Sequence, residues 1–481
     1  MAKSLKINYL LNLTNTITGI VFPIIAFPYA ARIMLADGIG LINFYSSIIN
    51  YIALFSCLGI PMYAIREIAK VRDDIQERNK ITLEILFLHL GLTSLGYVAV
   101  SIIASFIPQV QTHVPLFLLL SATIILTTIG CEWFYIGTED FLYITVRGVI
   151  VKSVSLIFLF VLVRTKEDIM WYALYTVIGS LGGNIFNFFR LRKLVDLKSI
   201  DLKELKPLNH LKPALRIFVL NLIISVYCNL NTVMLGFMKG NESVGLFTAA
   251  TRLTQVILAL VSSMSTVMLS RFTNLIANNQ TDRFEALAKK VITSVVAITL
   301  PLMVGLFAVA PMLIPIFCGE AYDGAVLTLQ LLSSIVVSIG LSNVLGIQIL
   351  YPMGKENIVI ISTAFGAVLN FMLNIILIPQ YSQNGAAIAT IVAEACVTIV
   401  MMIVGKNHIP IKWKQTAFLK YIISSVVMGI AVLYSIATIE LSIIPKFLFV
   451  VVIGVGTYFL CLMIMKDTLL KELILLIRKG N

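Results

Sequence analysis

About fourteen apolar stretches, each roughly long enough to cross a bilayer, follow one another through this chain with little between them. A hydrocarbon core about 30 Å thick needs about 20 helical residues, so such runs are typical of membrane helices. Hydrophobic residues make up 59% of the 481 residues and charged residues only 12%, which excludes a soluble fold. Because hydrocarbon offers backbone amides no partners, each segment must satisfy them internally as a helix. The sequence therefore predicts an all-α polytopic membrane protein.

The expected spans leave short connections and, being even in number, place both termini on the same side of the membrane. The first stretch lacks the short apolar core and cleavage site of a signal peptide, so we keep it as a mature helix. The spans are residues 9–33, 41–62, 82–107, 115–137, 143–163, 169–189, 215–237, 244–270, 291–317, 324–350, 357–379, 384–405, 416–436 and 446–465.

The net charge of +12 is distributed asymmetrically across these spans. Of the 36 lysines and arginines, 29 lie in or beside segments on the side of the termini. The others lie near the opposite face or inside spans: Arg32, Arg164, Lys166, Lys239, Lys446, Lys152 and Arg252. This asymmetry predicts that both termini are cytoplasmic. Anionic membrane lipids account for the basic balance, and we expect no nucleic-acid partner.

A polar segment between Arg190 and Arg216 divides six expected spans from eight. The motif DGIGLI at 37–42 opens the second helix, and ESVGLF at 242–247 opens the eighth, 205 residues later. Two six-helix halves related by an axis along the membrane normal are a known transporter plan, although chance similarity of helix starts is the alternative. We expect a six-helix N-terminal half at 1–190 and a cytoplasmic basic linker at 191–214. A six-helix C-terminal half at 215–405 follows, and a helix pair with an amphipathic cytoplasmic tail occupies 406–481.

Enzymatic chemistry finds little support in the sequence. Extramembrane loops are short, and no P-loop, HExxH or GxSxG motif occurs. The six cysteines are scattered singly, without metal-ligand or redox spacing. We therefore expect no cofactor.

Two polar faces stand out because polar groups inside a membrane are costly. In the first helix Asn8, Asn12, Asn15 and Gly19 share one face, since they fall at i, i+4, i+7 and i+11. The seventh helix repeats this spacing. Facing one another, the two would line a hydrophilic cavity; alternatively, they only hydrogen-bond neighbouring helices. The seventh-helix residues are Asn221, Ser225, Cys228 and Thr232, with Asn229 and Asn231 beside them.

Arg252 is the strongest single indication of a binding site. It lies well inside the eighth helix, where only an interior partner or an aqueous cavity makes a guanidinium tolerable. As a functional group it would clamp a phosphate with two parallel hydrogen bonds. As a structural group it would pair with a buried carboxylate such as Glu394 in the twelfth helix.

Three further residues are candidates of other kinds. Arg32 and Arg66 lie at helix ends, where arginines bind substrate or simply extend to lipid headgroups. Glu394, flanked by small residues, could take up a proton or coordinate sodium, or could pair with a buried cation.

Several motifs resemble one family. The segment PYAARI at 28–33 with GIG at 38–40 is similar to the first hairpin of Wzx-type polysaccharide flippases, of the multidrug/oligosaccharidyl-lipid/polysaccharide exporter superfamily. LGI at 58–60 with YAIREIA at 63–69 resembles the end of their second helix. GLFTAATRL at 245–253 and GAAIAT at 385–390 resemble the starts of their eighth and twelfth helices. Leu35 is a departure, because the family often has glycine there.

The resemblance implies a flippase in the bacterial cytoplasmic membrane. Its substrate would be an undecaprenyl-diphosphate-linked oligosaccharide, moved from the inner to the outer leaflet by alternating access between two halves. Similarity to lipid II flippases implies diphosphate contacts for Arg32 and Arg252. A proton or sodium gradient is a possible energy source, and a polysaccharide polymerase and chain-length proteins are possible partners.

Two other functions stay open. A multidrug extrusion antiporter of the same superfamily would share the fold, but its cavity would favour aromatic and acidic groups for cationic drugs, against which Arg252 argues. A membrane polysaccharide polymerase or acyltransferase would be expected to carry a large outer loop or a catalytic His/Asp arrangement, and neither is found.

Overall fold

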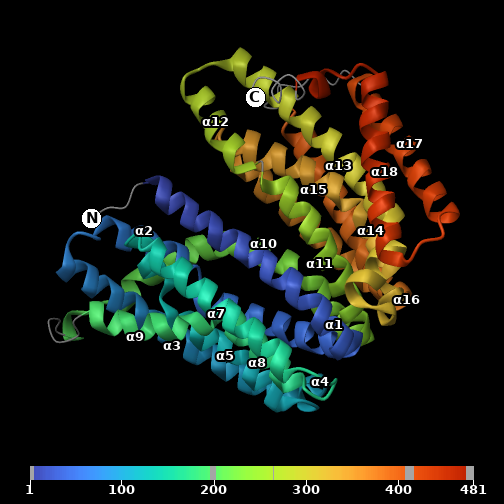
Figure 1. The fold of residues 1–481 in the computed structure, drawn as a ribbon. Helices are drawn as coiled ribbons and strands as arrows, with labels where there is room; N and C mark the ends of the chain where they lie inside the picture. The colour runs from blue at the N-terminus through green and yellow to red at the C-terminus, as the bar shows by residue number, and fades with distance from the viewer. Residues whose placement is uncertain (1–4, 196–201, 264, 407–415, 473–481) are drawn as a thin grey trace. The chain divides into compact units, whose positions relative to one another are not determined.

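The computed structural model describes residues 5–195, 202–263, 265–406 and 416–472, which are almost entirely helical and contain no β-strand (Figure 1). This confirms the all-α prediction. The helices are α1 (Leu5–Cys57), α2 (Ile60–Lys70), α3 (Ile75–Phe106), α4 (Pro108–Gln111), α5 (Val114–Gly130), α6 (Glu132–Gly137), α7 (Phe141–Leu162), α8 (Ile169–Val177), α9 (Gly183–Leu194), α10 (Leu211–Lys239), α11 (Asn241–Ser263), α12 (Ser265–Ala277), α13 (Thr281–Cys318), α14 (Val326–Ser333), α15 (Ile335–Asn343), α16 (Glu356–Val404), α17 (Thr416–Thr438) and α18 (Ile443–Ile464).

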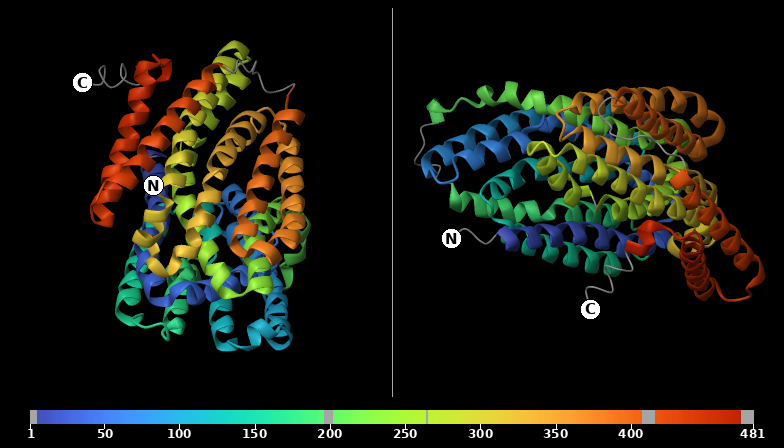
Figure 2. Two further views of the ribbon diagram at one scale, coloured as in Figure 1. Left: turned by 90° about the vertical axis from the view of Figure 1, so that its right-hand side faces the viewer. Right: turned by 90° about the horizontal axis from the view of Figure 1, so that it is seen from above.

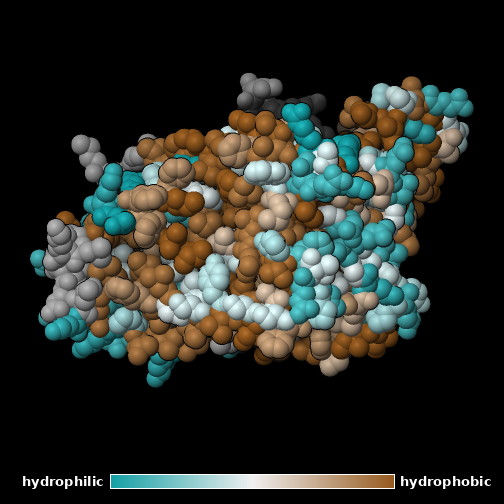
Figure 3. Space-filling model, turned by 90° about the horizontal axis from the view of Figure 1, so that it is seen from below, coloured by the Kyte–Doolittle hydropathy of each residue, from teal (hydrophilic) through white to brown (hydrophobic). Residues whose placement is uncertain are grey.

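The described residues form ten helical segments long and apolar enough to cross a membrane, or eleven if one bent pair counts as a span. Two long helices, α1 and α16, each join two expected spans across a break, at Leu35 and at Ser382. Figure 3 shows broad hydrophobic areas on one face of the molecule, beside areas where hydrophilic residues gather. A multi-pass membrane protein is confirmed, and the count of fourteen spans stays a prediction.

The chain forms two compact units, Met1–Gly245 and Leu246–Asn481. The first unit contains α10, which we expected at the start of the C-terminal half. A close backbone approach explains this placement: a Cβ on Gly59 would lie 2.7 Å from the carbonyl oxygen of Ala214 and 2.8 Å from the nitrogen of Phe218. Gly59 therefore lets the α1–α2 junction pack directly on α10. The boundaries of the predicted repeat are a separate matter and stay a prediction.

The break in α1 has a counterpart between α10 and α11. Leu35 has φ 55° and ψ −178°, and Gly240 has φ 84° and ψ −176°. Their numbers differ by 205, the offset between the two sequence motifs. This backbone region is essentially restricted to glycine. Leu35, the departure from the family pattern, thus occupies a turn at which the second copy has glycine.

A reciprocal contact between helix starts follows the same offset. A Cβ on Gly40 would lie 1.7 Å from the carbonyl oxygen of Asn241, and one on Gly245 would lie 1.8 Å from that of Ala36. Ala36 and Asn241, like Gly40 and Gly245, are 205 residues apart. Each glycine therefore lets its helix touch the backbone of the other helix at the equivalent position. A duplicated helix start would make such a self-complementary contact.

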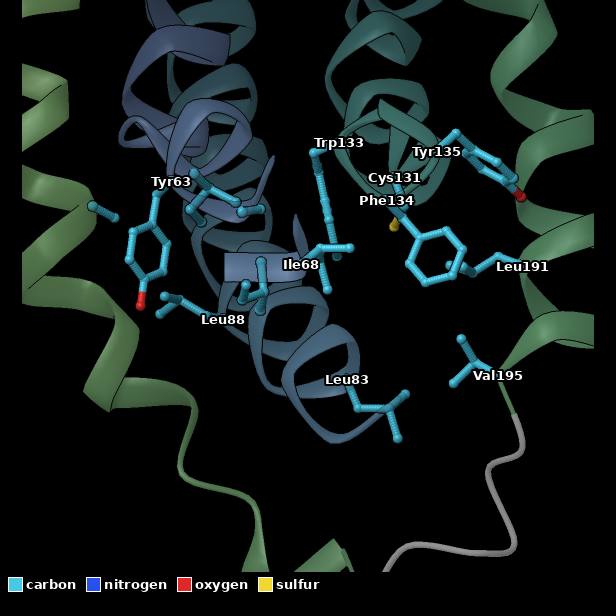
Figure 4. Packing of buried hydrophobic residues seen from close by; sticks show 14 of the residues in the cluster. Tyr63, Ile68, Leu83, Leu88, Cys131, Trp133, Phe134, Tyr135, Leu191 and Val195 are labelled. Carbon is cyan, nitrogen blue, oxygen red and sulfur yellow. The ribbon is translucent and has the colours of Figure 1, made fainter. Parts of the chain in front are cut away.

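One end of the first unit is held by an aromatic core. Tyr63 and Ile68 of α2, Trp133 and Phe134 of α6, and Leu191 of α9 are all nearly inaccessible. Figure 4 shows Trp133 beside Ile68, and Phe134 pointing toward Leu191. Dispersion contacts of this kind bring three helices from distant parts of the sequence together.

A buried hydrogen-bond network fixes the segment before α10 to this core. The carboxylate of Glu84 accepts from the backbone N–H of Lys206 at 2.8 Å and bonds Nε2 of His210 at 2.8 Å. The hydroxyl of Tyr63 bonds Nδ1 of His210 at 2.7 Å. Because buried polar groups must be paired, this network holds the described part of the linker against α2 and α3.

The second unit contains the final helix pair. α17 and α18 form a hairpin that packs on α13, as Figures 1 and 2 show. The Tyr458 hydroxyl of α18 donates to the carbonyl oxygen of Ala297 in α13 at 2.6 Å. The Tyr421 hydroxyl of α17 donates to the carboxylate of Asp467 at 3.0 Å. The expected amphipathic tail reaches into residues 473–481, which lie outside the described residues.

Candidate substrate-binding and ion-coupling sites

Arg252 lies in α11 with an exposed side chain, while its neighbours Leu253 and Thr254 are buried. Among the described residues of the second unit it forms no ion pair and no hydrogen bond. The structural alternative, an ion pair between Arg252 and Glu394, is therefore not formed among the described residues of the second unit. A permanent charge in a membrane helix is tolerated where water or an anionic ligand reaches it. This geometry suits a phosphate clamp.

Glu394 lies in the second half of α16, and its residue is 8% exposed. Its backbone oxygen accepts from the hydroxyl of Thr398, which also donates to the carbonyl oxygen of Ser338 in α15 at 3.0 Å. Gly366, in the first half of α16, allows close packing here, since a Cβ on it would lie 2.3 Å from Cγ2 of Val397. Glu394 is thus a carboxyl group in a tightly packed, buried environment. Its coupling role stays a prediction.

Arg32 and Arg66 both have partners near in sequence. Arg32 is exposed on α1 and donates to the carbonyl oxygen of Pro28 at 3.2 Å. Arg66 lies near the end of α2, pairs with Glu67 at 3.1 Å and stacks 5.6 Å from the centre of the Tyr63 ring. These local contacts fit helix-end arginines, and direct substrate contact stays a prediction for both.

The polar face of the first helix packs against α7. The side-chain oxygen of Asn15 lies 3.4 Å from where a Cβ on Gly148 would be, and Nζ of Lys152 lies 3.9 Å from where one on Gly19 would be. Thr145 of α7 donates to the carbonyl oxygen of Leu11 at 3.1 Å. Asn15 therefore takes part in helix packing within the first unit. The side chains of Asn8 and Asn12 lie outside the described part of the structure.

The polar face of the seventh helix is described only in part. Asn229 of α10 is half-buried and accepts from the side-chain amide of Asn50 in α1 at 3.5 Å, which is the long limit of a hydrogen bond. The side chain of Asn221 is not among those described. The cavity lined by both polar faces thus stays a prediction.

A cavity of about 660 Å³ in the second unit, between α12, α13 and the segment after α15, was not predicted from the sequence. Arg271, Arg283 and Lys290 line it together with Asn343 and Gln348. Lys290 also pairs with Glu472. A π-helical segment, Val344–Leu350, forms one wall, and such segments are frequent at functional sites. The clustered basic residues at 271–290 were the available signal.

The sequence pattern of the family described as "Polysaccharide biosynthesis protein" matches residues 5–276, more than half of the chain. The chain belongs to this family. The predicted resemblance to Wzx-type flippases is thereby confirmed.

Two relatives share one description with each other, "Putative O-antigen transporter". A "Putative O-antigen transporter" of Escherichia coli (strain K12) is 24% identical over 390 residues, which cover 80% of this chain and 93% of the relative. One of Shigella dysenteriae is 24% identical over 403 residues, covering 84% of this chain and 99% of the relative.

Solved structures share the fold. A lipid II flippase, MurJ, in an inward closed conformation superimposes with a TM-score of 0.75 at 17% identity, covering 96% of this chain and 99% of that one. An inward-facing multidrug resistance transporter of the MATE family gives 0.65 at 13% identity, covering 83% of this chain and 96% of that one. The first comparison also includes the region of α17 and α18, since it spans nearly the whole chain.

Proposed function

We propose that this protein is a flippase that moves an undecaprenyl-diphosphate-linked oligosaccharide from the inner to the outer leaflet of the bacterial cytoplasmic membrane. Family membership, together with two relatives described as O-antigen transporters, supports a transporter rather than an enzyme. The substrate combines a hydrated sugar and a diphosphate with a polyprenyl tail that stays in lipid. It requires a polar, cationic path within a membrane-embedded fold.

Arg252 is the observation that carries this proposal most directly. An exposed guanidinium, unpaired among the described residues of its unit, offers a planar pair of donors inside the membrane. A diphosphate provides the matching acceptors and the opposite charge. A cationic drug would be repelled at this position, so the multidrug antiporter is the weaker alternative.

The remaining roles complete the proposed mechanism. The two halves rock about the bound diphosphate to give alternating access. Glu394 exchanges a proton or sodium ion in step with this motion, and no cofactor takes part. Both termini lie in the cytoplasm, where the basic segments meet anionic lipids. A polysaccharide polymerase and chain-length proteins would use the translocated repeat unit.

Deletion of the gene tests the proposed direction of transport. Lipid-linked oligosaccharide should accumulate on the inner leaflet, inaccessible to a lectin or glycosidase added to intact spheroplasts. Accumulation on the outer leaflet would indicate a later step, such as polymerisation. Unchanged lipid-linked oligosaccharide with increased drug sensitivity would support the antiporter instead.

A further inference from the structure

A groove of about 830 Å³ lies between α7 and α9 in the first unit, and none of the residues proposed to bind substrate lines it. Three cations line it, Arg147, Arg190 and Lys193, against the carboxylate of Asp140. Arg190 and Lys193 belong to the last two turns of α9, and Asp140 precedes the first residue of α7. Arg190, Lys193 and Asp140 are therefore at helix ends, where a membrane protein meets the headgroup layer, and Arg147 lies nearly two turns into α7.

The two arginines hold more donors than their protein partners use. Arg147 reaches Glu132 at 3.5 Å, and Arg190 pairs with Asp140 at 2.7 Å and stacks 3.9 Å from the centre of the Tyr143 ring. Nε and Nη1 of Arg147 and Nη1 of Arg190 are nevertheless buried without an acceptor among the described residues. These three atoms face the protein interior, but the Arg190 side chain as a whole is 36% exposed and Lys193 is exposed. Both side chains can therefore donate to an anionic oxygen in the groove.

The rest of the groove is apolar and uncovered. Along α7, Leu142, Val146 and Ile150 are 42%, 48% and 56% exposed, and along α9 Phe186 and Phe189 are 57% and 58% exposed. Ile150 lies two turns or more beyond the start of α7, and Phe186 lies one turn before Arg190. Ile150 and Phe186 thus form an apolar wall that lies further from these helix ends than the charged residues do.

We propose that this groove binds an anionic glycerophospholipid. Its phosphodiester would lie against Arg190, Arg147 and Lys193, and an acyl chain would follow Ile150 and Phe186. Basic pockets between membrane helices are known binding sites for acidic headgroups. The apolar wall selects a lipid over a free phosphate, because a soluble anion would leave it uncovered. The proposal concerns lipid binding alone and does not depend on the transported substrate.

Lipid binding in this groove can be tested by native mass spectrometry. The full-length protein is released from nanodiscs that contain equal amounts of phosphatidylglycerol and phosphatidylcholine. The wild type should retain phosphatidylglycerol in preference to phosphatidylcholine. Lys193→Gln, which removes an exposed charge, and Arg190→Gln should weaken that retention, Arg190→Gln by about tenfold for the loss of a charged hydrogen bond. Arg192→Gln is the matched control, because Arg192 is exposed on the same helix, lies outside the groove lining, and carries the same charge.

The outcomes separate the possibilities clearly. Equal loss of phosphatidylglycerol in Arg192→Gln would mean a general charge effect and would overturn the proposed site. Displacement by millimolar glycerol phosphate would show that a soluble phosphate suffices and would overturn the lipid assignment. If Arg190→Gln fails to fold, Lys193→Gln still decides, because this exposed side chain can be changed without removing a core contact. The proposal would be contradicted if phosphatidylglycerol retention stayed unchanged both in Lys193→Gln and in the double variant that combines Arg190→Lys with Lys193→Gln.

Discussion

At position 35 glycine should give a more stable protein than alanine, which is the opposite of their order inside an ordinary helix. Leu35 has φ 55° and ψ −178°, a conformation that costs a side-chain-bearing residue about 1–3 kcal/mol. Glycine relieves that strain but loses about 0.5–1 kcal/mol of conformational entropy relative to alanine. Leu35→Gly should therefore be more stable than Leu35→Ala by about 0.5–2 kcal/mol. Both variants lose the same leucine side chain, so side-chain burial largely cancels.

Two comparison sites make this a test of backbone conformation. Leu13 is in the same helix and, like Leu35, is 42% exposed, but its backbone is helical. There glycine should be less stable than alanine by about 1 kcal/mol. At Gly240, the counterpart of Leu35, a Cβ would meet no atom within 4 Å. Gly240→Ala should still cost about 0.5–2 kcal/mol, because only the backbone conformation penalises it.

The measurement is the unfolding midpoint of the purified variants in mixed micelles with increasing SDS, followed by circular dichroism. We expect the glycine variant to have the higher midpoint at position 35 and the alanine variant to have it at position 13. Gly240→Ala should have a lower midpoint than the wild type. If alanine were the more stable residue at both 35 and 13, the break in α1 would carry no strain.

Three further predictions concern contacts and coupling. Gly245→Ala should destabilise the protein, because its Cβ would lie 1.8 Å from the Ala36 carbonyl oxygen. Gly456→Ala is the control and should not, because its Cβ would have no atom within 4 Å. Equal unfolding midpoints for the two variants would refute the contact. Glu84→Gln should lose about 1.5–3 kcal/mol by weakening the bond to His210, and a midpoint like that of exposed Glu77→Gln would contradict this. Glu394→Gln keeps the side-chain volume but removes the ionisable group, so transport in vesicles should lose its dependence on a proton or sodium gradient. If that dependence were unchanged, Glu394 would have only a structural role.

Hydropathy alone predicted the helical membrane fold, because apolar runs of bilayer length have few alternatives. The 205-residue offset pointed to Gly40 and Gly245, and the family pattern marked Leu35 as unusual. The placement of α10 was not predictable, since it follows from a backbone approach at Gly59.

Side-chain pairing was equally out of reach of the sequence. Asn15 lies against α7 and Glu84 bonds His210, because helix rotation and the path of the linker decide such contacts. The cations of the groove between α7 and α9 belong to two helices that the sequence gives no reason to bring together. Arg252 could be singled out because a charge in an apolar helix is informative by itself.

Transbilayer movement of the lipid-linked oligosaccharide in proteoliposomes tests the central claim most directly. Purified wild-type protein should speed the exposure of a fluorescent undecaprenyl-diphosphate oligosaccharide to an impermeant quencher. Arg252→Ala should reduce the rate at sub-saturating substrate by about tenfold or more, since a hydrogen bond to a charged group contributes about 1.5–3 kcal/mol, and Arg252→Lys should be intermediate. Wild-type protein that does not accelerate movement, or Arg252→Ala at the wild-type rate in equally loaded vesicles, would contradict the account.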